Sequence, residues 1–68
     1  MKATVKLLKD SLLTIVDAKG NEQTVELVSN HDIVAGMTTG WCEDDCKTLV
    51  VGDNVFGVKK VVSTRKAS

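Results

Sequence analysis

Residues 12–28 read L-L-T-I-V-D-A-K-G-N-E-Q-T-V-E-L-V and carry the clearest structural signal in the chain. Two runs rich in β-branched residues, 12–16 and 24–28, flank the polar stretch 17–22. Gly20 can adopt the left-handed conformation that a type I turn followed by a G1 bulge requires. The stretch therefore predicts a β-hairpin, and the run 12–17, apolar on both faces, is typical of a central strand.

The composition extends this prediction to the rest of the chain. Eleven valines, seven threonines and two isoleucines among 68 residues favour strands, and there is no proline. Residues 3–8 alternate, which places Val5 and Leu7 on one face of a strand. One alternative stays open, because apolar residues also recur at helical spacing and fit an amphipathic helix over 4–16.

The C-terminal third predicts further strands, over 47–51 and 55–62. In the last strand Phe56, Val58 and Val62 share one face, and Gly57 marks a bulge or a sharp bend. The run L-V-V-G-D-N-V-F-G-V, residues 49–58, is similar to the V-G-D-x-V lead-ins of SH3-like and other small barrels. This similarity covers about ten residues; it indicates a kind of barrel and no particular family.

The predicted fold is all-β. Residues 1–68 form one small domain with five or six short antiparallel strands, a meander that rolls into a barrel, SH3-like or similar. At most one short helix is expected, near 30–36, and the basic tail 63–68 is expected to fray. A core of this size rarely supplies more than about 3–5 kcal/mol of stability. We therefore expect help from a homo-oligomer or from a tightly bound partner.

The charges are sorted along the chain although the formal net charge is zero. All nine acids lie between Asp10 and Asp53, a span with only two lysines, whereas the two ends carry seven basic residues. This order predicts one basic and one acidic face if the terminal strands are neighbours. Folding that intermixes the signs is an equally open alternative.

Both cysteines lie in W-C-E-D-D-C, residues 41–46, and four interpretations compete. Cys42 and Cys46 could bind zinc together with His31, act as a redox pair, form a local disulfide, or stay reduced in an acidic turn. The intervening acids disfavour thiolates, which argues against metal and redox chemistry. We favour the acidic turn with reduced cysteines and expect no cofactor.

The same loop offers a protein-binding surface. Trp41 beside Glu43, Asp44 and Asp45 forms an aromatic anchor with an acidic rim, suited to a partner with a basic surface. The competing interpretation is that Trp41 closes one end of the core.

A basic cluster near the C-terminus suggests nucleic acid as an alternative partner. Its residues are Lys59, Lys60, Arg65 and Lys66. Against this, the chain has one tryptophan, one phenylalanine and no tyrosine, and its pI is near 6.5. A charged edge strand that resists aggregation explains the same cluster.

No catalytic motif occurs, so we expect no enzymatic activity. No apolar run is long enough for a signal peptide or a membrane span, which predicts a cytoplasmic protein with no membrane contact. The sequence thus favours a small non-enzymatic binding protein that acts by protein–protein contact, as an inhibitor, adaptor or assembly subunit. Its size class fits phage or mobile-element accessory proteins. The alternatives are a nucleic-acid-binding barrel and a zinc-stapled module.

Overall fold

The computed structural model describes residues 2–44 and 46–67, which form six β-strands. These are β1 (Lys2–Lys9), β2 (Leu12–Asp17), β3 (Glu22–Leu27), β4 (Thr38–Gly40), β5 (Thr48–Val51) and β6 (Asn54–Arg65). The described residues contain no helix, so 30–36 is a loop and 4–16 belongs to two strands. The predicted all-β fold is confirmed.

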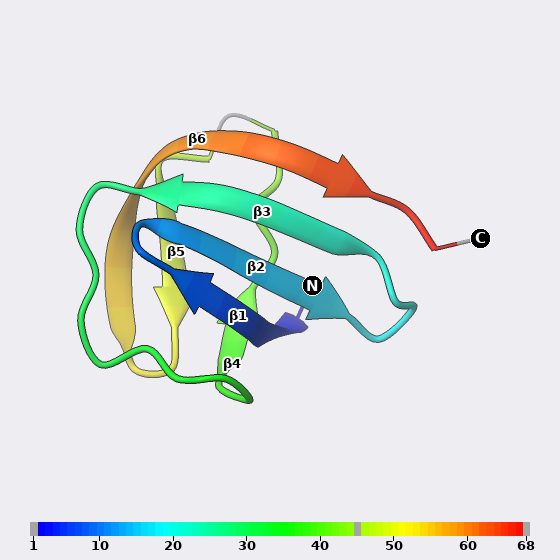
Figure 1. Cartoon of the computed structure of the whole chain (residues 1–68), viewed down its shortest axis with the longest axis horizontal. Helices are drawn as coiled ribbons and strands as arrows, with labels where there is room; N and C mark the ends of the chain where they lie inside the picture. The colour runs from blue at the N-terminus through cyan, green and yellow to red at the C-terminus, as the bar shows by residue number, and fades with distance from the viewer. Residues whose placement is uncertain (1, 45, 68) are drawn as a thin grey trace.

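The strands form a closed antiparallel barrel in the order β1-β2-β3-β6-β5-β4 (Figure 1). Two three-stranded meanders, β1–β3 and β4–β6, are joined edge to edge by the pairing of β3 with β6 and of β1 with β4. A single continuous meander would instead pair β3 with β4. The connection 28–37 crosses from the first meander to the second. The long strand β6 pairs with β5 in its first part and with β3 in its second part.

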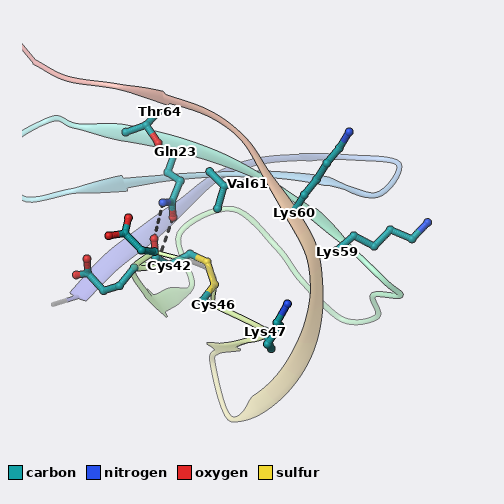
Figure 2. A pocket seen from close by; sticks show the side chains of 10 residues that line it. Gln23, Cys42, Cys46, Lys47, Lys59, Lys60, Val61 and Thr64 are labelled. Atoms are coloured by element: carbon teal, nitrogen blue, oxygen red, sulfur yellow. Dashed lines mark hydrogen bonds between the residues drawn. A yellow bond between two sulfur atoms is a disulfide. The ribbon is translucent and has the colours of Figure 1, made fainter.

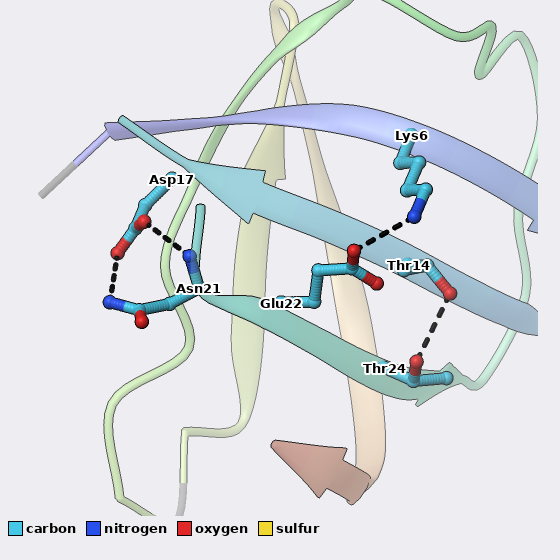
Figure 3. A network of polar contacts seen from close by, with 6 residues as sticks. All are labelled: Lys6, Thr14, Asp17, Asn21, Glu22 and Thr24. Atoms are coloured by element: carbon cyan, nitrogen blue, oxygen red, sulfur yellow. Dashed lines mark hydrogen bonds and ion pairs between the residues drawn. The ribbon is translucent and has the colours of Figure 1, made fainter. Parts of the chain in front are cut away.

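The β2–β3 hairpin turns as the sequence predicts. Gly20 has a φ of 87°, and its amide donates to the Asp17 carbonyl at 3.1 Å. The Asp17 carboxylate accepts a hydrogen bond from the Lys19 amide at 2.9 Å. It also accepts from the Asn21 amide at 2.9 Å and from Asn21 Nδ2 at 3.0 Å (Figure 3). One buried carboxylate thus organises the whole turn.

The turn makes folding stability depend on pH through Asp17. Desolvation raises the pKa of Asp17, but the hydrogen bonds from Asn21 and Lys19 outweigh it and hold the pKa below the ordinary value. The charged form therefore stabilises the fold at neutral pH, and this contribution disappears as the pH falls below about 4 and through the folded-state pKa.

We expect Asp17→Ala to lower the urea midpoint of unfolding at pH 7 and to flatten the loss of stability at acid pH. Urea unfolding at pH 7 and pH 3 measures both effects. Asp53→Ala, at an exposed position in the β5–β6 turn, is the matched control and should change little. An unaltered pH dependence in Asp17→Ala would contradict the role given to this carboxylate.

The core is formed by side chains that alternate along the strands. Leu13, Ile15 and Val25 are fully buried, whereas Thr14 and Thr24 point outward and share a hydrogen bond of 3.0 Å (Figure 3). The buried apolar residues are Ala3, Val5, Leu13, Ile15, Val25, Leu27, Cys42, Leu49, Val51, Phe56 and Val58.

Bulges correct two of the predicted faces. The β1–β2 register shifts at Lys6, so Leu7 is 55% exposed and Leu8 packs against the core instead. The β3–β6 register shifts twice, at Lys59 and at Val62, and Val62 is 47% exposed. Each extra residue moves the alternation by one position, which turns the following side chains to the other face of the sheet.

Strand β6 bends where it passes from β5 to β3 (Figure 1). Gly57 is its last residue paired with β5, and a Cβ there would lie 3.3 Å from Val28 Cγ2. Pairing with β3 continues to Arg65, and the Ala67 amide donates to Asn21 Oδ1 at 2.8 Å. The segment 63–68, predicted to fray, is thus held to β3 at least through Arg65.

Candidate functional site: the groove beside β6

A groove of about 610 Å³ lies between β6 and the loop 41–47 (Figure 2). Lys59, Lys60, Val61 and Thr64 of β6 line it on one side. The loop lines it with Cys42, Glu43, Asp44, Cys46 and Lys47, and Gln23 of β3 lies between them. Segments distant in the sequence therefore meet in one hollow.

The groove exists because β5 and β6 differ in length. Strand β5 has 4 residues and β6 has 12, so β5 accompanies β6 only as far as Gly57. The Val58 amide still donates to the Lys47 carbonyl at 2.8 Å. Beyond it, within residues 2–44 and 46–67, β6 pairs with β3 alone. The opposite edge of residues 59–65 consequently borders the groove.

The inner face of this open part of β6 is uncovered. Val61 and Thr64 pair with Val25 and Gln23, whose side chains are buried in the barrel. Val61 is nevertheless 37% exposed, and Thr64 is exposed as well.

The loop wall of the groove is closed by a disulfide between Cys42 and Cys46, whose Cα atoms are 5.6 Å apart. The Cys46 amide donates to the Glu43 carbonyl at 3.1 Å and tightens the turn between them. Our preference for two reduced cysteines is therefore wrong, and the local disulfide is the alternative that the structure shows. The electrostatic argument concerned thiolates, and a disulfide carries no charge for the acids to oppose.

Gln23 fastens this loop to the sheet. Its Nε2 donates to the Cys42 carbonyl at 2.7 Å, and its Oε1 accepts from the Cys42 amide at 3.0 Å (Figure 2). Both residues are buried, so these bonds satisfy backbone groups that water does not reach. Sequence reasoning missed Gln23, although the alternation with Val25 and Leu27 already turns its side chain inward.

The groove combines both signs of charge. Its lining residues include Glu43, Asp44 and Lys47 of the loop and Lys59 and Lys60 of β6. Figure 2 shows the Lys59 and Lys60 side chains extending from β6 away from the loop. Of the two charge arrangements left open by the sequence, the structure therefore shows intermixing.

Ion pairs on the outer face mix the charges further. Lys6 Nζ lies 2.8 Å from Glu22 Oε2 (Figure 3), and Lys59 Nζ lies 4.0 Å from Glu26 Oε2. The hydrogen bond from Lys6, with weaker attraction from Arg65, holds the pKa of Glu22 below its ordinary value against desolvation.

Not all predicted site residues line the groove. Trp41 is half-buried, packs against the core and borders a separate hollow of about 170 Å³ together with Asp17 and Lys66. Arg65 lies at the end of β6 opposite Glu22. Asp45 lies outside the described residues.

His31 occupies a different environment from the cysteines. Its Nδ1 is 3.4 Å from Asp32 Oδ2, and its ring centroid is 5.1 Å from that of Phe56. The two sulfur atoms are bonded to each other, which removes the thiolates that a zinc site on Cys42, Cys46 and His31 needs. Within the described ranges, no group of three or more His, Cys, Asp or Glu side chains is arranged for a metal ion.

The outer face of β5 and β6 carries an apolar pair. Val50 and Val55 lie directly opposite each other in the β5–β6 ladder and are 51% and 65% exposed. The outer surface of β1–β3 bears the ion pair between Lys6 and Glu22 and also exposes Leu7 and Leu12.

Comparison of the chain with protein-family models, with curated proteins and with solved structures finds no match. Among the residues that the structure describes, no helix has the length and apolar character needed to cross a membrane.

Proposed function

We propose that this protein is a non-enzymatic binding module that acts by protein–protein contact through the groove beside β6. The observation that supports it is an open strand edge beside a groove whose lining residues carry both signs of charge. A partner protein can form backbone hydrogen bonds with an open strand edge. Complementary charges on the two proteins then fix the register of the contact.

The groups in the groove suit binding better than catalysis. Among the described residues that line it, the ionisable side chains are carboxylates and lysines, and both sulfur atoms are in the disulfide. Carboxylates and lysines can act as catalytic acids, bases or nucleophiles, but they are usually activated by burial or by a close charged neighbour. The five ionisable side chains that the structure describes in this groove are all exposed, and we therefore propose binding and not a reaction.

Nucleic acid is the less favoured partner. Glu43 and Asp44 share the groove with the lysines and repel phosphate, Lys59 approaches Glu26, and Arg65 lies opposite Glu22. Affinity for a phosphate backbone grows with the number of phosphates that basic side chains neutralise, and neighbouring carboxylates reduce that number. A protein segment needs only a few matched charge pairs beside its other contacts. A mixed-charge protein surface meets no such opposition.

We expect groove substitutions to remove a specific protein partner. Immobilised wild-type protein, Lys59→Glu/Lys60→Glu and Glu43→Lys/Asp44→Lys are each incubated with extract of cells that express the chain, and bound proteins are quantified by mass spectrometry. A partner that contacts both walls should fall by about tenfold or more with either double variant, because each reverses a charge pattern it matches. Circular dichroism establishes that the variants fold.

Lys9→Glu is the matched control, since Lys9 is exposed on β1 and does not line the groove. The control should retain the partner. Retention by all variants would contradict the proposed surface. Recovery of nuclease-sensitive material, lost only with the lysine variant and falling with salt, would establish the nucleic-acid alternative instead.

The finer role, as inhibitor, adaptor, assembly subunit or phage accessory protein, stays a prediction, and so does the cytoplasmic location. The disulfide weighs against the cytoplasmic prediction, because disulfides persist mainly in oxidising compartments. Self-association also stays a prediction, and native mass spectrometry of the purified chain measures it directly.

A further inference from the structure

We infer that the groove takes up an extended segment of the partner protein as an additional β-strand alongside β6, and that this segment alternates acidic with small apolar side chains. The inference rests on the proposed function and specifies how the contact is made. Three observations on β6 support it.

The first is the free backbone edge of β6. A closed barrel pairs its strands on both sides, yet β6 outruns β5 and keeps one unpaired edge along 59–65 in the described chain. Backbone amides and carbonyls on such an edge are a template for another strand. The adjoining groove leaves room for that strand, which is the arrangement used in peptide recognition by strand addition.

The second observation concerns the inner face of the added strand. Its inward side chains would lie beside Val61 and Thr64 and over the wall made by the Cys42–Cys46 disulfide. Figure 2 shows Val61 close to Gln23, on the same side of β6 as the disulfide. Space between two walls and an apolar neighbour favour small apolar residues at these alternate positions.

The third observation concerns the outer face. Lys60 and Arg65 are exposed there, in the rows of Glu26 and Glu22 of β3. A carboxylate on the added strand would complete each row, so that a basic side chain of β6 lies between two acidic ones. Cross-strand pairs of opposite charge stabilise a sheet, whereas like charges destabilise it.

The same charges argue against a second copy of this chain as the occupant. Residues 59–65 read K-K-V-V-S-T-R and contain three basic residues and no acid. Two copies paired edge to edge would bring six positive charges together with no compensation between the edges. A partner segment with acidic residues is therefore the better match.

The experiment is a titration of the 15N-labelled full chain with a short capped peptide of alternating glutamate and valine, followed by NMR. We expect shift changes confined to 42–47 and 59–65. A peptide of alternating lysine and valine should bind at least about tenfold more weakly, as should a glutamate–valine peptide N-methylated at alternate amides, because methylation removes the backbone donors.

Two variants check the outward contacts. Lys60→Gln/Arg65→Gln should weaken binding of the glutamate–valine peptide by about tenfold, while Lys9→Gln should leave it unchanged. Size-exclusion chromatography of the free chain tests the second copy. A dimer abolished by Lys60→Glu would overturn the inference, as would peptide binding indifferent to N-methylation or absent at millimolar concentration. Preferential shifts with an oligonucleotide would overturn it in favour of nucleic acid.

Failure of this inference is distinguishable from failure of the proposed function. If the groove variants lose their protein partner but the peptide series shows no effect of N-methylation, the groove binds protein by side chains and not by strand addition. If the groove variants keep every partner, the proposed surface itself is wrong.

Discussion

Replacing Gln23 with leucine is expected to destabilise the protein by about 2–6 kcal/mol. Leucine keeps the size of the side chain but can neither donate to the Cys42 carbonyl nor accept from the Cys42 amide, which Gln23 bonds at 2.7 and 3.0 Å. Each buried backbone group without a partner costs about 1–3 kcal/mol. Since a core of this size supplies only about 3–5 kcal/mol in total, the variant should be close to unfolding at room temperature.

Urea unfolding followed by tryptophan fluorescence measures this change, because Trp41 lies in the loop that Gln23 holds and packs against the core. Thr24→Val is the matched control. It removes the hydrogen bond between the Thr14 and Thr24 hydroxyls, which lie half-exposed on the outer face of the sheet. Because surface substitutions usually have small effects, the free energy of unfolding should fall by less than about 1 kcal/mol. A Gln23→Leu variant as stable as the control would mean that the loop is not fastened to β3 in this way.

Reducing the Cys42–Cys46 disulfide is expected to cost about 2 kcal/mol, the chain-entropy value for so short a closed loop. For a domain of this size that corresponds to a fall in Tm of about 8–16 °C. Calorimetry with and without reductant measures the difference. The double variant Cys42→Ala/Cys46→Ala should unfold at a lower temperature than the oxidised protein and should not respond to reductant.

The loop lines the groove, so reduction should also weaken partner binding. Native mass spectrometry without reductant or chelator provides the decisive mass. An oxidised, metal-free chain fits the disulfide. A chain with free thiols or with bound zinc would contradict it and would return the loop to the interpretations that the structure disfavours.

The sequence predicts the fold well where local chemistry decides it. Gly20 and the polar turn specify the β2–β3 hairpin, because a positive φ and a carboxylate acceptor are properties of a few adjacent residues. β-Branched composition specifies strands throughout, and the choice of strands over a helix in 4–16 follows from it.

Bulges limit the prediction of which residues face the core. Leu7 and Val62 fit the period-two pattern but point outward, since an extra residue at Lys6, and others at Lys59 and Val62, shift the alternation. A bulge depends on the pairing of two strands, and one strand's sequence does not record it.

The groove was beyond sequence reasoning for a related reason. The acidic loop and the lysines of β6 looked like two separate surfaces for two different partners, and the barrel's closure places both on one hollow. The difference in length between β5 and β6, which creates the open edge, appears only once the strands are paired. Gln23 is the exception, because the alternation with Val25 and Leu27 predicts that this polar side chain points into the barrel.

The free edge of β6 is the feature on which the proposed binding depends most directly, and amide hydrogen exchange of the uncomplexed 15N-labelled chain tests it. Amides of 59–65 that donate to β3 should exchange slowly, and those that face the groove should exchange at close to the rate of an exposed loop. Slow exchange along both edges of this segment would show that another part of the chain, or a second copy, already covers the edge, and it would contradict a groove open to a partner.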